Sequence, residues 1–179
     1  PSGELPYRSK IFAQANGEAL GDTGESLIAY GGRLYLSVNG SKYLAKLDGS
    51  GHLLDKHEFS EQEGEPRQIA ASDGFVYVTL YSGHVAKFDT ASLQKPVAMV
   101  EVGSNPEGIC ISGGNIYVAN SGWGMDNRLS VIDLQEFKTA IHYEVENNLQ
   151  DVKAVGDSVY ATYYKPDYSM GMANVDISK

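Results

Sequence analysis

The sequence contains a single cysteine, Cys110, so no disulfide bond can form within one chain. A chain of 179 residues needs no such cross-link, because a domain of this length buries roughly 70% of the surface that its unfolded chain exposes. Cys110 lies between two isoleucines in the segment Gly-Ile-Cys-Ile-Ser. This apolar setting predicts a buried structural thiol rather than a nucleophile. The lack of disulfides does not by itself indicate a cellular compartment.

Long apolar runs and an excess of basic residues are also absent from the sequence. No segment approaches the roughly 20 apolar residues that a membrane-spanning helix requires, so we predict no membrane span. The 23 acidic residues outnumber the 14 basic ones and give a net charge of −9. A chain of this charge repels phosphate backbones, and we therefore expect no nucleic-acid partner.

The four histidines show none of the spacings that are typical of metal or catalytic sites. His52, His57, His84 and His142 lie in unrelated sequence contexts, and no His-x-x-x-His pair occurs. A Ser-His-Asp or Cys-His arrangement cannot be assembled from the spacing of these residues. We therefore predict no catalytic residues and no cofactor, and we favour a non-enzymatic role over an enzymatic one.

What the sequence does contain is an internal repeat. Tyrosines within apolar segments recur at intervals of 42, 40 and 43 residues, at Tyr35, Tyr77, Tyr117 and Tyr160. Eight positions before each tyrosine stands an aliphatic residue: Leu27, Ile69, Ile109 or Val152. Three positions before each tyrosine stands a residue that favours turns: Gly32, Gly74, Gly114 or Asp157. Several markers in one register indicate a structural period.

Each unit also contains a third apolar segment that ends in an aspartate, and a fourth apolar segment follows in the first three units. Recurrence in every unit predicts that these aspartates cap turns rather than catalyse a reaction; they are Asp48, Asp89, Asp133 and Asp176. Within residues 76–81 the side chains alternate as in a strand, and both alternating sets are largely apolar or aromatic. Both faces of each small sheet should therefore be covered.

A unit of this length with four short antiparallel strands matches the blade of a β-propeller. We predict an all-β, single-domain β-propeller over residues 1–179, with units at residues 24–63, 64–103, 104–146 and 147–179. Residues 10–14 are expected to form a leading outer strand. The chain forms either a closed four-blade ring or a fragment of a larger propeller, and we favour the fragment. A half ring exposes strand edges and could associate with another copy of itself.

The third unit carries the most specific motifs. They are the strand Tyr117-Val118-Ala119-Asn120, the strand Ser130-Val131-Ile132-Asp133, and the linker Val-Gly-Ser-Asn-Pro at residues 102–106. These motifs resemble the YVTN family of β-propeller repeats, to which YncE-like proteins belong. The second unit matches nearly as well, whereas the first and fourth units lack the proline before the first strand and the asparagine of the second. The resemblance covers most of the chain at the level of the fold and about half of it in motif detail.

The resemblance implies a protein of the bacterial periplasm or cell surface, such as a surface-layer-like protein. The chain begins with Pro1, and its first ten residues, PSGELPYRSK, lack the apolar core of a signal peptide. We expect that the N-terminus has been trimmed and that any export signal is missing from this chain. The resemblance implies much less about activity, because propellers carry many unrelated functions.

In a propeller, the loop before the first strand and the loop after the second strand of each blade meet at one rim. We expect the ligand-binding residues at this rim to be Arg67, Glu107, Asn120, Trp123, Tyr163 and Tyr164. Candidate ligands for a hard cation such as Ca²⁺ are Glu25, Asn105, Glu107 and Asp151. A solvated polar rim is the favoured interpretation, because Arg67 among carboxylates favours ion pairing over metal binding.

The loops after the second strands are short in the first two units and long in the last two, where they read SGWGMDNR and YKPDYSMG. Insertions on one face of a repeat protein often mark its binding surface. These loops contain the only tryptophan, Trp123, together with Tyr164 and Tyr168. Aromatic rings beside amides and carboxylates suit stacking on sugar or peptide groups. The alternative is that Trp123 only caps a channel or packs between blades.

The sequence therefore favours a non-enzymatic binding or scaffold module of the bacterial cell envelope, with a protein, peptide or glycan bound at the rim. The alternative is a lactonase-like hydrolase that depends on a divalent cation, which would polarise the substrate carbonyl and activate water. A third possibility is a structural surface-layer tile that only assembles with itself.

Overall fold

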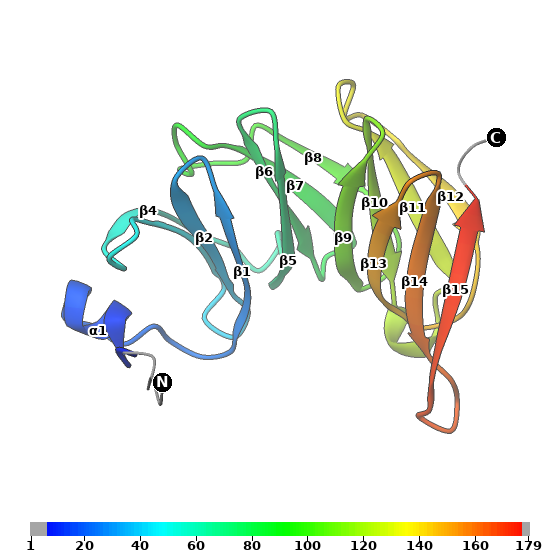
Figure 1. Ribbon diagram of the computed structural model, residues 1–179, viewed down its shortest axis with the longest axis horizontal. Coiled ribbons are helices and arrows are strands. Elements are labelled where there is room, and N and C mark those ends of the chain that lie inside the picture. The colour runs from blue at the N-terminus through cyan, green and yellow to red at the C-terminus, as the bar shows by residue number, and fades with distance from the viewer. Residues whose placement is uncertain (1–6, 177–179) are drawn as a thin grey trace, which may run out of the picture.

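The computed structural model describes residues 7–176, which form fifteen strands, one α-helix and one short 3-10 helix. The strands make four antiparallel sheets, three with four strands and the last with three (Figure 1). The prediction of an all-β chain built from repeated antiparallel sheets is confirmed. Within the described part, no helix has the length and apolar character that a membrane crossing requires.

Each repeat unit forms one sheet, and strands that are consecutive in the chain are neighbours in it. The first sheet contains β1 (Gly24–Tyr30), β2 (Arg33–Val38), β3 (Tyr43–Leu47) and β4 (Leu53–Glu58). The second contains β5 (Pro66–Ser72), β6 (Phe75–Leu80), β7 (His84–Asp89) and β8 (Ala98–Glu101). The third contains β9 (Pro106–Ser112), β10 (Asn115–Asn120), β11 (Arg128–Asp133) and β12 (Ala140–Glu144). The fourth contains β13 (Leu149–Val155), β14 (Ser158–Tyr164) and β15 (Met170–Asp176).

The turn between the first and second strands explains the recurring glycines. Tyr30 pairs with Arg33, so only two residues, Gly31 and Gly32, connect β1 to β2. Their φ angles are 56° and 70°. A two-residue hairpin that matches the twist of its strands needs positive φ at both positions, which glycine adopts without a steric penalty. The same positive angles recur at the turns of the second and third sheets.

The recurring aspartates cap the turn that follows the third strand. The Oδ1 atom of Asp48 accepts hydrogen bonds from the backbone N–H groups of Ser50 and His52, at 2.8 and 3.0 Å. Asp89 and Asp133 accept equivalent bonds from residues two positions further along the chain. The predicted turn-capping role is thus confirmed for these three residues.

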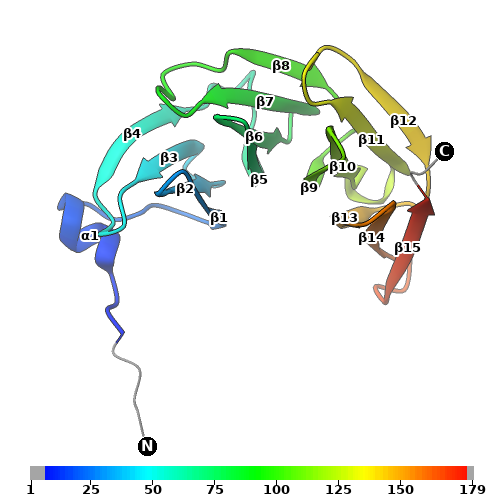
Figure 2. The same cartoon turned by 45° about the horizontal axis from the view of Figure 1, so that its top comes forward.

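The four sheets stand face to face along an open arc (Figure 2). The first strand of each sheet lies on the inner side of the arc, and β4, β8 and β12 lie on the outer side. Neighbouring first strands contact one another in the order β1, β5, β9 and β13. This order places the loops that precede β5, β9 and β13 close together along the inner side.

The core lies between the sheets rather than within one layer. Tyr35 of β2 is buried in a cluster with Ile69 and Val78 of the second sheet. Tyr77 of β6 occupies the equivalent place between the second and third sheets, and Tyr117 of β10 lies between the third and fourth. The repeating tyrosines therefore mark the contacts between sheets. Cys110 belongs to the third of these clusters, where burial raises the pKa of its thiol to about 11.

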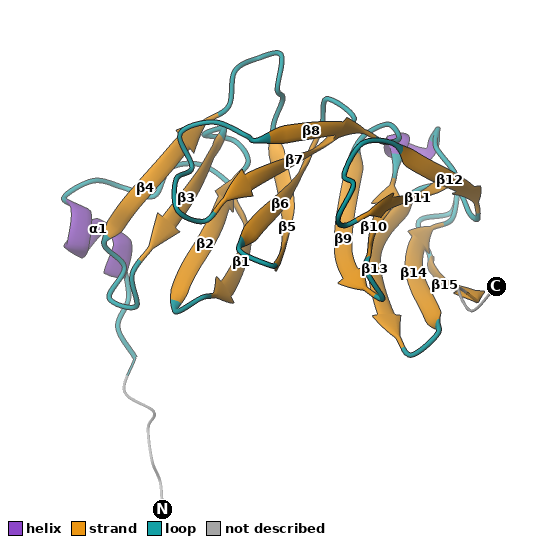
Figure 3. Cartoon of the chain, turned by 90° about the horizontal axis from the view of Figure 1, so that it is seen from above, coloured by secondary structure: helices purple, strands orange, loops and turns teal. Residues whose placement is uncertain are grey.

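The predicted leading strand at residues 10–14 is wrong. Residues in this segment form the helix α1 (Ile11–Asn16), which ends at Gly17 with a φ of 73°. The side chain of Asn16 joins the helix to the first sheet, because it donates to the carbonyl of Gly51 and accepts from the N–H of Leu53, both at 2.8 Å. Phe12 packs into a cluster with Leu36, Val38 and Leu47 of that sheet. These tertiary contacts hold a short helix of six residues that the sequence pattern does not indicate. Figure 3 shows this helix at the N-terminal end of the arc, far from the fourth sheet.

Candidate functional site

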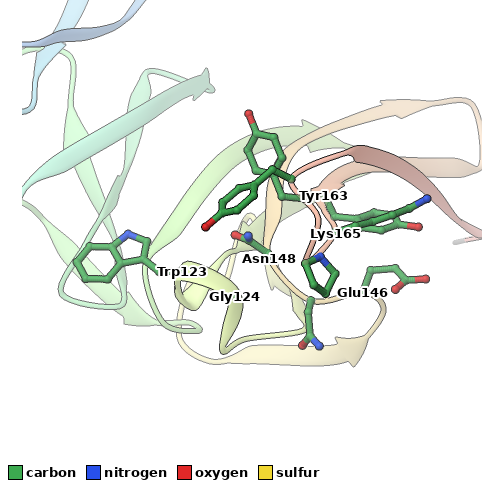
Figure 4. A pocket seen from close by; sticks show the side chains of 10 residues that line it. Trp123, Gly124, Glu146, Asn148, Tyr163 and Lys165 are labelled. Carbon is green, nitrogen blue, oxygen red and sulfur yellow. The ribbon is translucent and has the colours of Figure 1, made fainter.

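A pocket of about 360 Å³ lies where the long loops of the third and fourth sheets meet (Figure 4). Three connections surround it: the loop between β10 and β11, the connection from β12 to β13, and the loop between β14 and β15. The lining residues are Trp123, Gly124, Glu146, Asn147, Asn148, Tyr163, Tyr164, Lys165, Pro166 and Tyr168. The pocket thus combines four aromatic side chains with amides, one carboxylate and one ammonium group.

The aromatic side chains of the pocket are largely exposed. Trp123 has 73% of its surface exposed and Tyr168 has 86%, whereas Tyr164 is about half as accessible as Tyr168. Tyr163 is partly buried and lies opposite Gly171 on β15, where a Cβ atom would clash with its ring. Figure 4 shows Trp123 on one side of the pocket, with Tyr163 and Lys165 across from it. Exposed flat apolar rings of this kind suit stacking against a ligand.

The loop that carries Trp123 is held by a buried carboxylate. Asp126 accepts hydrogen bonds from the backbone N–H groups of Ser104 and Arg128, at 2.7 and 2.9 Å. The Arg128 guanidinium adds two more, at 2.6 and 2.9 Å. Burial raises the pKa of Asp126, but these hydrogen bonds outweigh it and leave the pKa below its usual value. The geometry also requires glycine at position 103, because a Cβ there would lie 2.6 Å from Asp126 Oδ2.

Trp123 itself has a left-handed backbone, with φ 50° and ψ 41°. The backbone N–H of Trp123 donates to the side-chain oxygen of Ser121 at 3.3 Å. The indole ring meets the ring of Tyr81 edge to face, with 5.9 Å between the ring centres. A non-glycine residue in this conformation is uncommon and is retained where the surrounding structure over-determines it. The indole is therefore presented to solvent on a constrained turn.

Asn148 forms the polar wall of the pocket. Its backbone N–H donates to the carbonyl of Asp126 at 2.9 Å, and its carbonyl accepts from the N–H of Tyr164 at 3.2 Å. The side chain of Gln150 donates to Asn148 Oδ1 at 2.8 Å. These bonds tie the connection between the third and fourth sheets to both long loops. The pocket walls thus form one hydrogen-bonded unit.

A second cluster surrounds Arg67 on the inner side of the arc. The guanidinium binds Glu25 of the first sheet at 2.7 Å and Glu107 of the third sheet at 2.6 and 2.7 Å. Tyr81 donates its hydroxyl to the other oxygen of Glu107 at 2.7 Å, and Arg67 lies over the Tyr81 ring at 5.0 Å. Burial, followed by the bond to Glu107, raises the pKa of Tyr81 to about 12. The cluster links three sheets, and Tyr81 connects it to Trp123.

The candidate cation ligands do not come together as one site in the structure. Glu25 and Glu107 both bind Arg67, and Asp151 binds Lys153 at 2.7 Å. The carbonyl of Asn105 accepts hydrogen bonds from the N–H and the hydroxyl of Ser121. Within residues 7–176, no group of three or more His, Cys, Asp or Glu side chains is positioned to hold a metal ion.

The predicted ligand-binding residues fall into three groups. Trp123, Tyr163 and Tyr164 come together in the pocket. Arg67 and Glu107 form the neighbouring ion-pair cluster. The third group is Asn120 alone, which is completely buried beneath the loop between β10 and β11.

The amide of Asn120 is occupied by the protein itself. It accepts from the N–H of Gly103 at 3.0 Å and donates to the carbonyl of Arg128 and the hydroxyl of Ser130, at 2.7 and 2.8 Å. Asn120 therefore supports the loop from below and does not face the pocket.

Several residues of the pocket carry little signal in the sequence. Glu146, Asn147 and Asn148 lie in the connection after the fourth strand of the third unit, which resembles an ordinary polar linker. A pair of asparagines directly before a strand is the one available hint, because it indicates a turn with polar side chains. Their position opposite Trp123 follows only from the packing of the fourth sheet on the third.

Comparison with known proteins identifies no family. No family model matches the chain, and no curated protein matches it. The solved structures with a similar fold include two computationally designed proteins. The designed Ika8 protein aligns with a TM-score of 0.68 over 88% of this chain at 12% identity, and the chain spans 47% of its length. The designed Ika4 protein aligns with a TM-score of 0.65 at 12% identity, over 88% of this chain and 94% of its own. At this level of identity, the similarity concerns the fold alone.

Proposed function

We propose that this chain is a stretch of β-propeller with four blades, one for each sheet. The support is the succession of units in one register, with first strands on the inner side of the arc and tyrosines between adjacent sheets. Its proposed role is that of a non-enzymatic binding module, and the ligand occupies the pocket between the third and fourth blades.

The observation that carries this proposal is the composition of the pocket. Trp123, Tyr164 and Tyr168 present exposed aromatic rings, and Asn148 and Glu146 supply polar groups beside them. Sugars combine flat apolar C–H faces with hydroxyl groups at their edges, which fit stacking rings flanked by amides and carboxylates. We propose a short glycan as the ligand, and a peptide is the second class to be tested.

A divalent-cation-dependent, lactonase-like hydrolase is less well supported. Such an enzyme needs carboxylates that are available to the cation at the inner rim. Glu25 and Glu107 are instead engaged by Arg67 in short ion pairs. The Arg67 guanidinium is bound to both carboxylates and offsets half of the charge that would attract a cation, so the arrangement favours a binding module.

Glycan and peptide arrays, followed by calorimetry with the best ligand, test the proposal. Trp123→Ala and Tyr168→Ala should each weaken glycan binding about tenfold, which corresponds to about 1.4 kcal/mol and is in the range of an aromatic contact. Tyr7→Ala is a matched control, because Tyr7 is 87% exposed and lies in the N-terminal segment, away from the pocket.

Equal binding by wild type and both pocket variants would place the ligand elsewhere and refute the proposed site. Binding of peptides but not of glycans would replace the ligand class while keeping the pocket. A ligand whose binding falls in Tyr7→Ala as much as in Tyr168→Ala is a nonspecific aromatic binder.

The proposed location is the bacterial cell envelope, on the periplasmic side or at the cell surface. This part of the proposal depends on the sequence resemblance to exported propeller repeats. Fractionation of cells that express the natural gene, with an antibody against this chain, tests it. Recovery of the protein in the cytosolic fraction would contradict an envelope role.

A further inference from the structure

The contacts between adjacent sheets follow one rule. The tyrosine of the second strand in one sheet is buried in the same cluster as the aliphatic residue of the first strand in the next sheet. Tyr35 and Ile69 share the first of these clusters, and Tyr77 and Ile109 share the second. Tyr117 and Val152 share the third. A sheet therefore offers a tyrosine face on one side and an aliphatic face on the other.

At the two ends of the arc, one aliphatic residue of a first strand and one tyrosine of a second strand are left uncovered. Leu27 is 60% exposed, whereas its counterparts in the other sheets are 6%, 5% and 0% exposed; they are Ile69, Ile109 and Val152. Tyr160 is 37% exposed, whereas its counterparts are 1%, 1% and 2% exposed; they are Tyr35, Tyr77 and Tyr117. Leu27 and Tyr160 are thus the two halves of one further contact. They lie in the first and the fourth sheet, at opposite ends of the arc (Figure 2), so one chain in this conformation does not bring them together.

The outer parts of the two end sheets differ from the repeat in complementary ways. On the first sheet, Phe12 and Leu20 of the N-terminal segment pack against Val38 and Tyr43, and they leave the inner strand with Leu27 uncovered. The fourth sheet has three strands in the described chain and lacks the outer one. A fourth sheet brought against a first sheet would therefore meet Leu27 with its inner strands. Helix α1 would lie where its missing outer strand would otherwise pack.

The uncovered face of the fourth sheet is apolar enough to serve as an interface. Strand register places Met172 opposite Thr162 and Met170 opposite Tyr164, on the same face as Tyr160. Met170 and Met172 are both more than half exposed. Two charged residues of this face, Asp151 and Lys153, form an ion pair of 2.7 Å, and a third, Asp176, lies opposite Ser158 at the end of β15. Contiguous exposed apolar surface rimmed by polar groups is typical of association sites.

We propose that two copies of this chain associate head to tail. The tyrosine face of each fourth sheet covers the aliphatic face of the other copy's first sheet, so that two arcs of four sheets close into one twofold-symmetric ring. Each copy contributes Tyr160 to one junction and Leu27 to the other. Ring closure covers the uncovered face at both ends of each arc, by the same contact that already joins the sheets within it.

Light scattering coupled to gel filtration, over a series of protein concentrations, measures the state of association. We expect wild type to have twice the 19.4 kDa mass of the chain. Leu27→Asp and Tyr160→Asp should each shift the protein to the mass of one chain, because either substitution places a carboxylate in both junctions. Val97→Asp is the matched control: Val97 is 54% exposed directly before β8 of the second sheet, and this sheet takes part in neither junction. Circular dichroism checks that each variant keeps its strands.

Cross-linking with a short bismaleimide provides a second readout that does not depend on disruptive variants. In a Cys110→Ser background, the double variant Leu27→Cys/Tyr160→Cys should yield a covalent dimer. Neither single cysteine variant should do so, because in the ring the two copies of each position lie at different junctions.

A wild-type chain that stays monomeric would overturn the proposal and indicate that other sheets, in a longer polypeptide, cover these faces. A dimer that survives Leu27→Asp, or cross-links through Tyr160→Cys alone, would overturn the head-to-tail arrangement in favour of a symmetric contact between fourth sheets. Masses that grow beyond two chains would overturn ring closure. Tyr164 belongs both to the pocket lining and to this face, but none of the substituted positions lines the pocket, so the binding proposal is tested separately.

Discussion

The third and fourth sheets derive from the same kind of repeat unit, yet they differ in how completely they are covered. The third sheet has four strands and packs between two neighbours, and its long loop is anchored by the buried Asp126. Within residues 7–176, the fourth sheet has three strands and one covered face, and its long loop carries Tyr168, which is almost fully exposed. The environment of a repeat position is thus set by the sheets that pack on either side of it. An identical residue can be core in one sheet and surface in the next.

The largest expected effect is a difference in the stability lost when the equivalent tyrosines of these two sheets, Tyr117 and Tyr160, are replaced. Tyr117→Ala should destabilise the fold by about 3–5 kcal/mol, because it opens a cavity between two sheets. Tyr160→Ala should cost about 1 kcal/mol or less, since part of its ring already faces water. Urea denaturation in dilute solution, where the chain is monomeric, measures both values. Equal losses would mean that the fourth sheet is covered in the monomer.

The second contrast concerns the aspartates of the two long loops. Asp126→Ala should cost about 2–3 kcal/mol, because it removes charge-assisted hydrogen bonds and leaves the backbone N–H of Ser104 without its acceptor. Asp167→Ala should leave the denaturation midpoint unchanged, because Asp167 bonds only to Ser169 in an exposed loop. Urea denaturation of the two variants measures the difference. A large loss in Asp167→Ala would show that the fourth loop is as firmly anchored as the third.

The pH dependence of stability should reveal the same anchor. The pKa of Asp126 is lowered in the fold, since hydrogen bonds from Arg128 and Ser104 outweigh the effect of burial. The stabilisation by its charged form is therefore complete above the ordinary aspartate pKa of about 3.9 and is lost as the pH falls through the lower folded value. Asp126→Asn should be less stable than wild type at neutral pH, and the gap should narrow below about pH 4. Denaturation curves at several pH values check this, and a gap that stays constant would contradict it.

The smallest expected effect is a difference in the reactivity of cysteine thiols, and it requires no change in the stability of the fold. Cys110 pairs with Tyr117 in the third sheet, and Lys153 pairs with Tyr160 at the same place in the fourth. Burial raises the pKa of Cys110 to about 11, so iodoacetamide should modify it slowly at pH 8. In dilute solution, where the chain is monomeric, a cysteine introduced by Lys153→Cys in a Cys110→Ser background should react at least about tenfold faster. Both cysteines should react at the same rate in urea, which serves as the control.

Much of the fold could be predicted from the sequence because the repeat is local. Tyr77, Gly74 and Asp89 each report a feature of one unit: a side chain between sheets, a turn with positive φ, and a capped turn. Helix α1 could not be predicted in this way, because its six residues are held against the first sheet by Phe12 and Asn16. A segment that depends on tertiary contacts leaves no periodic signal of its own.

The candidate site was only half accessible to sequence reasoning. Trp123 and Tyr164 stand out because they lie in or next to long loops, whereas the sequence around Asn148 is that of an ordinary polar linker. Asn120 belongs to a recognisable motif, yet in the structure its side-chain amide forms hydrogen bonds with Gly103 and Ser130 and does not face the pocket. The number and type of hydrogen-bond partners around a side chain depend on strands distant in the chain, and no sequence spacing records them.

The sequence by itself determined that the chain forms repeated antiparallel sheets, because alternating side chains and positive-φ glycines act over a few neighbouring residues. The tertiary structure alone decided which faces are covered, which carboxylates bind Arg67, and which loops meet to form the pocket. The physical reason is that burial and ion pairing depend on the distance between groups in space. In a repeat protein, that distance changes wherever a neighbouring sheet is missing.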